Sequence, residues 1–167
     1  MTILNVLYYP DPRLRTKAKL VENFDESLQT LISDMFETMY EHNGVGLAAT
    51  QVDVHKRIFI LDTSDDKSQP QIFINPDILE IREVKDWMEG CVSFPDVFGK
   101  TKRGLYVNVR YQDQNGETHE KEAHGLEAVG VQHETDHLNG DLLVDFVSPI
   151  TRMRIEKRMQ KLKKKRL

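Results

Sequence analysis

Two histidines and a glutamate in one short stretch of the chain have the types and spacing that metal-dependent hydrolysis requires. His133 and His137 are four residues apart, and Glu134 directly follows the first of them. On an α-helix, side chains four residues apart lie on one face, so both imidazoles can bind the same metal ion while Glu134 lies beside it as a proton-transfer group. The pattern is short, and a histidine pair in a hydrogen-bonded core is the alternative interpretation.

Cys91 is the only cysteine and the best candidate for a third metal ligand. A catalytic divalent metal commonly takes three protein ligands and keeps one position open, and a thiolate is a strong, soft ligand. A single cysteine is otherwise most often a small buried hydrophobic residue. Because a lone cysteine excludes an intramolecular disulfide, the composition suits a reducing compartment, and we expect a cytoplasmic protein.

A third segment, residues 44–51, is rich in small residues and ends in Gln51. Alone it is a weak signal, because it can be a simple glycine-rich turn and lacks the Lys-Ser/Thr ending of a phosphate-binding loop. Small residues also let a backbone approach a peptide substrate closely. The amide of Gln51 can donate a hydrogen bond to a developing oxyanion.

The elements that must position these residues follow from hydrophobic periodicity and turn residues. Helices are predicted over Asp25–Glu41, over a segment in which Leu126, Val129, His133 and His137 share one face, and over Pro149–Arg166. Strands are predicted at Arg57–Leu61, Ile72–Ile74, Ile78–Val84, Leu105–Tyr111 and Glu117–Ala123, with Asn75-Pro76 ending the second of them. We expect an α+β fold in which short, mostly antiparallel strands form small sheets around the central histidine-bearing helix.

Length and charge limit the possible classes of protein. The 167 residues suffice for one domain with a hydrophobic core, and we expect a single catalytic domain over 1–167 that includes the C-terminal basic helix 149–167. No apolar run approaches the length of a membrane span, and no signal peptide is expected at the start.

Nine of the 23 Lys and Arg residues but only one of the 27 acidic residues lie in 151–167, so this tail carries a net charge of +8 and the remaining chain −12. Such a tail is typical of contact with a negatively charged partner.

The three segments together resemble the peptide deformylase family. That family carries G-x-G-φ-A-A-x-Q, E-G-C-φ-S and Q-H-E-x-D-H-φ-x-G in this order, where φ is apolar. The chain has them at Gly44–Gln51, Glu89–Ser93 and Gln132–Gly140. The resemblance implies a hydrolase that removes the N-terminal formyl group from formyl-methionine of nascent polypeptides and releases formate.

The resemblance also implies roles for individual residues. Cys91, His133 and His137 match the metal ligands, Glu134 the general base and acid, and Gln51 with the backbone N–H of Val92 the pair that binds the formyl oxygen. The family holds its peptide as an added β-strand, here against the backbone of Val45, Gly46 and Gly90. The pocket for the methionine side chain maps to Val45, Trp87, Glu89, Leu126, Val129 and His133.

The cofactor and partners follow from the same resemblance. One divalent ion is expected, with Fe2+ as the native metal and Zn2+, Ni2+ or Co2+ as substitutes. The basic C-terminal helix is expected to dock a monomeric enzyme on the ribosome near the exit tunnel. Two residues depart from the family's usual pattern: Phe98 stands where many bacterial members have arginine, and Gly130 where many have cysteine.

Two other functions share part of this pattern. A zinc endopeptidase also uses H-E-x-x-H, but its usual third ligand is a downstream Glu or His, where this chain has Asp141 and Asp145. A non-enzymatic nucleic-acid-binding module with structural zinc would account for the basic tail. A structural site usually has four protein ligands, however, and only three are credible here. We interpret the other histidines as surface residues: His42, His55, His119 and His124.

One structural contact of the metal-binding helix is predicted. Asp136 lies between the candidate ligands His133 and His137, and Arg103 matches a recurrent arginine of the family. We expect Asp136 to accept a hydrogen bond from Arg103 or from a neighbouring loop, which would fix the helix against the Cys91 segment. Solvation of Asp136 at the surface is the alternative.

Overall fold

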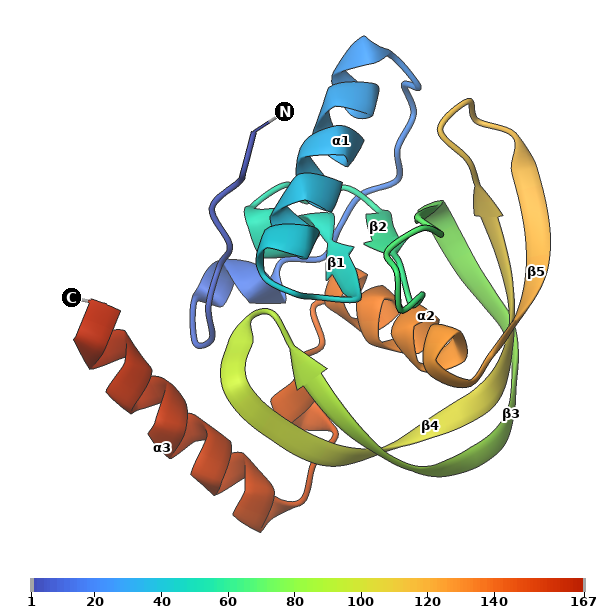
Figure 1. The fold of residues 1–167 in the computed structure, drawn as a ribbon. Coiled ribbons are helices and arrows are strands. Elements are labelled where there is room, and N and C mark those ends of the chain that lie inside the picture. The colour runs from blue at the N-terminus through green and yellow to red at the C-terminus, as the bar shows by residue number, and fades with distance from the viewer. Residues whose placement is uncertain (1, 167) are drawn as a thin grey trace.

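A computed structural model describes residues 2–166 and contains one five-stranded sheet in the order β1-β2-β3-β4-β5. Every neighbouring pair of strands is antiparallel. The strands are β1 (Gly46–Ala48), β2 (Ile58–Leu61), β3 (Gln71–Cys91), β4 (Phe94–Gln112) and β5 (Thr118–His124). The long β3–β4 hairpin curves beneath the central helix and carries one side of the site on its end (Figure 1).

Three α-helices surround or enter this sheet: α1 (Glu26–Glu41), α2 (Gly125–Leu138) and α3 (Pro149–Arg166). Asp25 caps α1 by accepting a hydrogen bond from the N–H of Leu28, and the Ser148 hydroxyl accepts one from the N–H of Thr151 at the start of α3. Helix α2 lies at the centre of the molecule (Figure 1) and carries both candidate histidine ligands.

The strand β2 is buried on both faces, which explains its uninterrupted apolar sequence. Ile58 and Ile60 pack in a cluster with α1, whereas Phe59 and Leu61 pack in a second cluster with the buried face of α2. The sheet therefore separates the two helices and fixes the position of α2 from behind.

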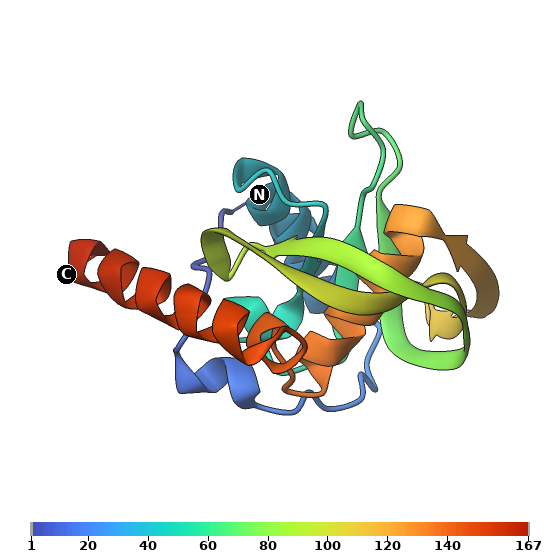
Figure 2. The same ribbon diagram turned by 90° about the horizontal axis from the view of Figure 1, so that it is seen from below.

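Helix α3 is attached by its apolar stripe. Ile155 and Met159 are buried and Leu162 packs partly against them, in a cluster that also contains Phe94. The helix runs along one side of the molecule, and its C-terminal end projects beyond the sheet (Figure 2). None of the helices within residues 2–166 is long and apolar enough to cross a membrane.

The structure confirms the α+β class, the three predicted helices and, to within one residue at each end, the strands predicted at Arg57–Leu61 and Glu117–Ala123, but β3 and β4 are much longer than the strands predicted there. The two strands expected at Ile72–Ile74 and Ile78–Val84 are parts of the single strand β3, and there is one sheet instead of several small ones. Asn75 has a φ of 51° and its side chain bonds both backbone groups of Val21, so Asn75-Pro76 forms an irregularity within β3. At this point β3 stops pairing with β2 and begins to pair mainly with β4.

Candidate metal centre and peptide-binding site

Three side chains from two distant segments converge on one point. The Sγ of Cys91 lies 3.3 Å from Nε2 of His137, and that nitrogen lies 3.2 Å from Nε2 of His133. Within the described part of the chain, these three form a compact group of possible metal ligands, with all ligand atoms within 4.8 Å of one another. The two histidines come from successive turns of α2, and Cys91 ends β3.

The second ring nitrogen of His133, Nδ1, already has a hydrogen-bond partner. Its Nδ1 lies 2.6 Å from Oε1 of Glu89, so Nδ1 carries the proton and the lone pair of Nε2 points towards Cys91 and His137. A carboxylate behind a histidine is the usual arrangement for a metal ligand, because it fixes the tautomer and raises the basicity of the ring. The donor set therefore fits a divalent metal ion.

Glu89 is held in turn by Arg103. The guanidinium donates to both carboxylate oxygens, at 2.6 Å and 3.1 Å, and the Thr101 hydroxyl donates to the same carboxylate. Burial alone would raise the pKa of Glu89, but hydrogen bonds from His133 and Arg103 outweigh it and lower the pKa to about 2. Glu89 is thus ionised, although only 4% of its side chain is exposed.

The predicted contact between Arg103 and Asp136 is confirmed. Nη1 of Arg103 lies 2.6 Å from Oδ2 of Asp136, and the guanidinium also lies over the ring of Phe146. One arginine therefore ties α2, through Asp136, to the β3–β4 hairpin, through Glu89. The negative charges of the two carboxylates compensate the buried cation.

Glu134 lies beside the candidate ligands, and one of its oxygens has no hydrogen-bond partner among residues 2–166. Its Oε1 is buried without a hydrogen bond to any described residue. Burial raises the pKa of Glu134 to about 7, and the charge of Glu89 adds to this effect. A Cβ atom at Gly46 would lie 2.6 Å from Oε2 of Glu134, so the glycine leaves the space that this carboxyl occupies.

The amide of Gln51 is oriented from both ends. Its Oε1 accepts a hydrogen bond from the N–H of Ala48 at 2.9 Å, and its Nε2 donates to Oγ of Ser93 at 3.0 Å. The same nitrogen lies 3.5 Å from Sγ of Cys91. Gln51 is buried next to the candidate metal ligands.

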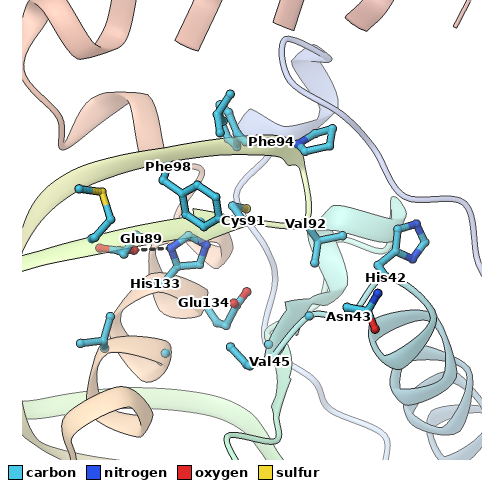
Figure 3. A pocket seen from close by; sticks show the side chains of 18 of the residues that line it. His42, Asn43, Val45, Glu89, Cys91, Val92, Phe94, Phe98, His133 and Glu134 are labelled. Atoms are coloured by element: carbon cyan, nitrogen blue, oxygen red, sulfur yellow. Dashed lines mark hydrogen bonds and ion pairs between the residues drawn. The ribbon is translucent and has the colours of Figure 1, made fainter. Parts of the chain in front are cut away.

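One cavity brings most of the predicted site residues together (Figure 3). The residues predicted to bind the peptide all line it: Val45, Gly46, Trp87, Glu89, Gly90, Leu126 and Val129. Cys91, Val92, His133 and Glu134 also line it, whereas Gln51 and His137 are not among the lining residues. Both residues that depart from the family's pattern, Phe98 and Gly130, are at the cavity.

Several residues of the site were not predicted from the sequence. His42, read as a surface residue, is half-buried and lines the cavity, and its ring lies 3.4 Å from the Tyr8 hydroxyl. Thr101 orients Glu89 across the β3–β4 hairpin, and Ser93, in the turn of that hairpin, orients Gln51. A histidine at the end of a helix could have been suspected from its proximity to Gly44. The contact of Thr101 has no local sequence signal, whereas Ser93 lies in the E-G-C-φ-S motif, which does not show that this serine contacts Gln51.

Comparison with known proteins matches the polypeptide deformylase family over residues 3–153. The chain belongs to this family. It is 54% identical to the peptide deformylase of Hahella chejuensis, with 99% of each chain covered, and 52% identical to that of Pseudomonas aeruginosa, with 96% of each covered. The crystal structure of a peptide deformylase from Legionella pneumophila superposes with a TM-score of 0.95 at 44% identity, covering 99% of this chain and 98% of that one.

Membership of the polypeptide deformylase family decides between the functions that the sequence left open. The chain is an enzyme of protein biosynthesis, a metal-dependent hydrolase that removes the N-formyl group from nascent polypeptides. Neither the endopeptidase nor the non-enzymatic zinc module is supported by any of these similarities.

Replacing Arg103 with Leu should lower the free energy of unfolding by roughly 3 kcal/mol, because it leaves the buried Glu89 without its main partner. Arg110→Leu is a matched control, since Arg110 pairs with Glu120 at the surface and should contribute less than about 1 kcal/mol. Urea unfolding at matched metal content measures both variants. Equal losses of unfolding free energy in the two variants would show that the buried contacts of Arg103 contribute no more to stability than a surface ion pair.

Proposed function

We propose that Cys91, His133 and His137 hold one divalent metal ion and that Glu134, Gln51 and Val92 carry out the hydrolysis of the formyl amide beside it. The observation that carries this proposal is the convergence of three ligand atoms within 4.8 Å, with His133 held by Glu89 in the tautomer that a ligand needs. A divalent ion bound there supplies Lewis acidity, which activates water and polarises the formyl carbonyl.

Glu134 acts as the proton carrier in this proposal. Its free Oε1 accepts a proton from the attacking water, whose oxygen bonds to the formyl carbon. The carbon–nitrogen bond then breaks, and Glu134 returns the proton to the leaving amine of methionine, so that formate and a free N-terminus are released. Glu134 is not a ligand, because the three ligand positions are filled by its neighbours.

Gln51 and the N–H of Val92 are proposed to stabilise the negative charge on the formyl oxygen. The hydrogen bonds of Gln51 to Ala48 and Ser93 fix its amide before the substrate arrives, which is what electrostatic stabilisation requires. Val92 lies at the cavity in the tight turn between the paired residues Cys91 and Phe94.

The peptide is proposed to bind as an additional strand between two open edges. β1 is an edge strand of the sheet, and in the described part of the chain the C-terminal half of β3 pairs only with β4. These two edges contribute Val45, Gly46 and Gly90 to the same cavity. An extended peptide between them could use backbone hydrogen bonds on both sides. The methionine side chain would enter the pocket lined by Trp87, Glu89, Leu126, Val129 and His133.

We propose that Fe2+ is the native metal and that Zn2+, Ni2+ or Co2+ can bind to the same ligands. Two imidazole nitrogens and one thiolate suit all four ions. Elemental analysis of protein purified without air distinguishes them.

Replacing Glu134 with Gln should reduce deformylation of a formyl-methionyl peptide by about 10²–10⁴-fold, since the amide cannot carry the proton. The bound metal should remain, because Glu134 is not a ligand. Formate release and elemental analysis on the same preparation test both parts. Activity within about tenfold of the wild type would remove Glu134 from this role.

We also propose that α3 docks the enzyme on ribosomal RNA near the exit tunnel, as a monomer in the cytoplasm. The buried Ile155 and Met159 fix the helix to the body, so its basic residues are held in a defined orientation. Ion pairs link Arg152 to Asp145 and Glu156, but within residues 2–166 none involves the cations from Lys157 to Arg166. These exposed cations are available for phosphate contact, and the net negative body would be repelled by RNA.

The triple variant Lys163→Gln, Lys164→Gln, Lys165→Gln should bind ribosomes more weakly and with a smaller salt dependence, while hydrolysis of a short formyl peptide stays unchanged. It keeps Ile155 and Met159, so the helix stays attached. The matched control replaces three exposed lysines of the body, Lys17, Lys85 and Lys100, with Gln. Co-sedimentation at several salt concentrations measures the difference. Equal binding by the two triple variants would show that α3 is not the anchor.

A further inference from the structure

Phe98 is a large apolar side chain that stays exposed at the edge of the cavity. It is 67% exposed and lines the cavity together with the residues proposed to bind the peptide. In Figure 3 its ring lies on the hairpin side, across from Val45, with His133 and Glu134 between them. The proposed chemistry does not use this ring, and burying it on a bound ligand would be favourable.

The alternation of side chains along β3 places Phe98 on the outer face of the hairpin. Glu89 reaches His133 and Cys91 reaches His137, so both point towards the metal-binding helix. Gly90, between them, must face the opposite way. A Cβ atom at Gly90 would lie 2.8 Å from Cε1 of Phe98, its cross-strand partner, so the ring covers the outer face of Gly90.

A peptide strand next to Gly90 must follow the same alternation. If its first side chain, methionine, points inward to the pocket beside Glu89, its second side chain points outward. The outer face beside Gly90 carries the ring of Phe98, and Met88, two residues before Gly90, lies on the same face and is 60% exposed.

We propose that Phe98 determines specificity for the second residue of the substrate by packing against its side chain and favouring apolar over polar side chains. This inference rests on the proposed seating of the peptide against Gly90. The ring has no hydrogen-bonding group, so a polar side chain covered by it would lose water contacts without replacement. An apolar or aromatic side chain would gain contact area with the ring.

The test uses formyl-methionyl tripeptides in two series. In one series the second residue is Phe, Leu, Asn or Gly and the third is Ser, and in the other the second is Ser and the third varies in the same way. Phe98→Ala should lower kcat/KM for second-residue Phe and Leu about fivefold relative to Gly, the fold-change that corresponds to roughly 1 kcal/mol of aromatic contact. Phe98→Leu should restore most of the preference for Leu.

Val84→Ala is the matched control, because Val84 is an apolar residue of the same hairpin, 59% exposed, that does not line the cavity. It should leave every ratio unchanged. An equal loss for all substrates in Phe98→Ala, including second-residue Gly, would mean that Phe98 only supports the hairpin, and would overturn the proposal. A change confined to the third-residue series would also overturn it. A wild-type enzyme inactive on every formylated peptide would instead refute the proposed function, so the two failures are distinguishable.

Discussion

The rest of the site depends on the hydrogen bonds that the buried carboxylate of Glu89 accepts. It accepts hydrogen bonds from Nδ1 of His133, from Arg103 and from Thr101, and so joins α2 to the β3–β4 hairpin. A carboxylate at this depth would be costly alone, and the guanidinium that compensates it also reaches Asp136 on the next turn of α2. One charge network therefore fixes two things at once: the ring orientation of a candidate ligand and the distance between α2 and Cys91.

The positions of the remaining groups follow from close backbone packing around this network. Helix α2 is buried along most of its length, with Val131 and Leu138 packed against Phe59 and Phe73 of the sheet, so it has little freedom to move. Glu134 fits only because residue 46 has no side chain. The strand that carries Gly46 also presents an open edge to the cavity, so the same glycine suits both the proton carrier and the peptide seating that we propose.

The sequence predicted the helices well because their signals are local. Asp25 and Ser148 cap two of them, and the spacing of His133 and His137 identifies the candidate ligand face of the third. The continuity of β3 was not predictable in this way, because Asn75-Pro76 looks the same whether a strand ends or changes its partner. The convergence of Cys91 with the histidines was expected from its ligand chemistry and from the family resemblance. The contact of Thr101 with Glu89 depends on strand register, which no local pattern encodes, and the contact of Ser93 with Gln51 joins segments that are far apart in the sequence.

We propose that Cys91 completes a metal site that α2 alone cannot form, and the metal content of the enzyme with and without this thiol decides the point. Wild-type enzyme and the Cys91→Ala variant would be purified without air and analysed for bound metal per chain, with formate release from a formyl-methionyl peptide measured on the same samples. Circular dichroism would verify that the variant is folded. We expect about one divalent ion per wild-type chain and the loss of most metal and activity in Cys91→Ala, because two imidazoles alone form an incomplete catalytic site. A folded Cys91→Ala protein with full metal content and full activity would contradict it.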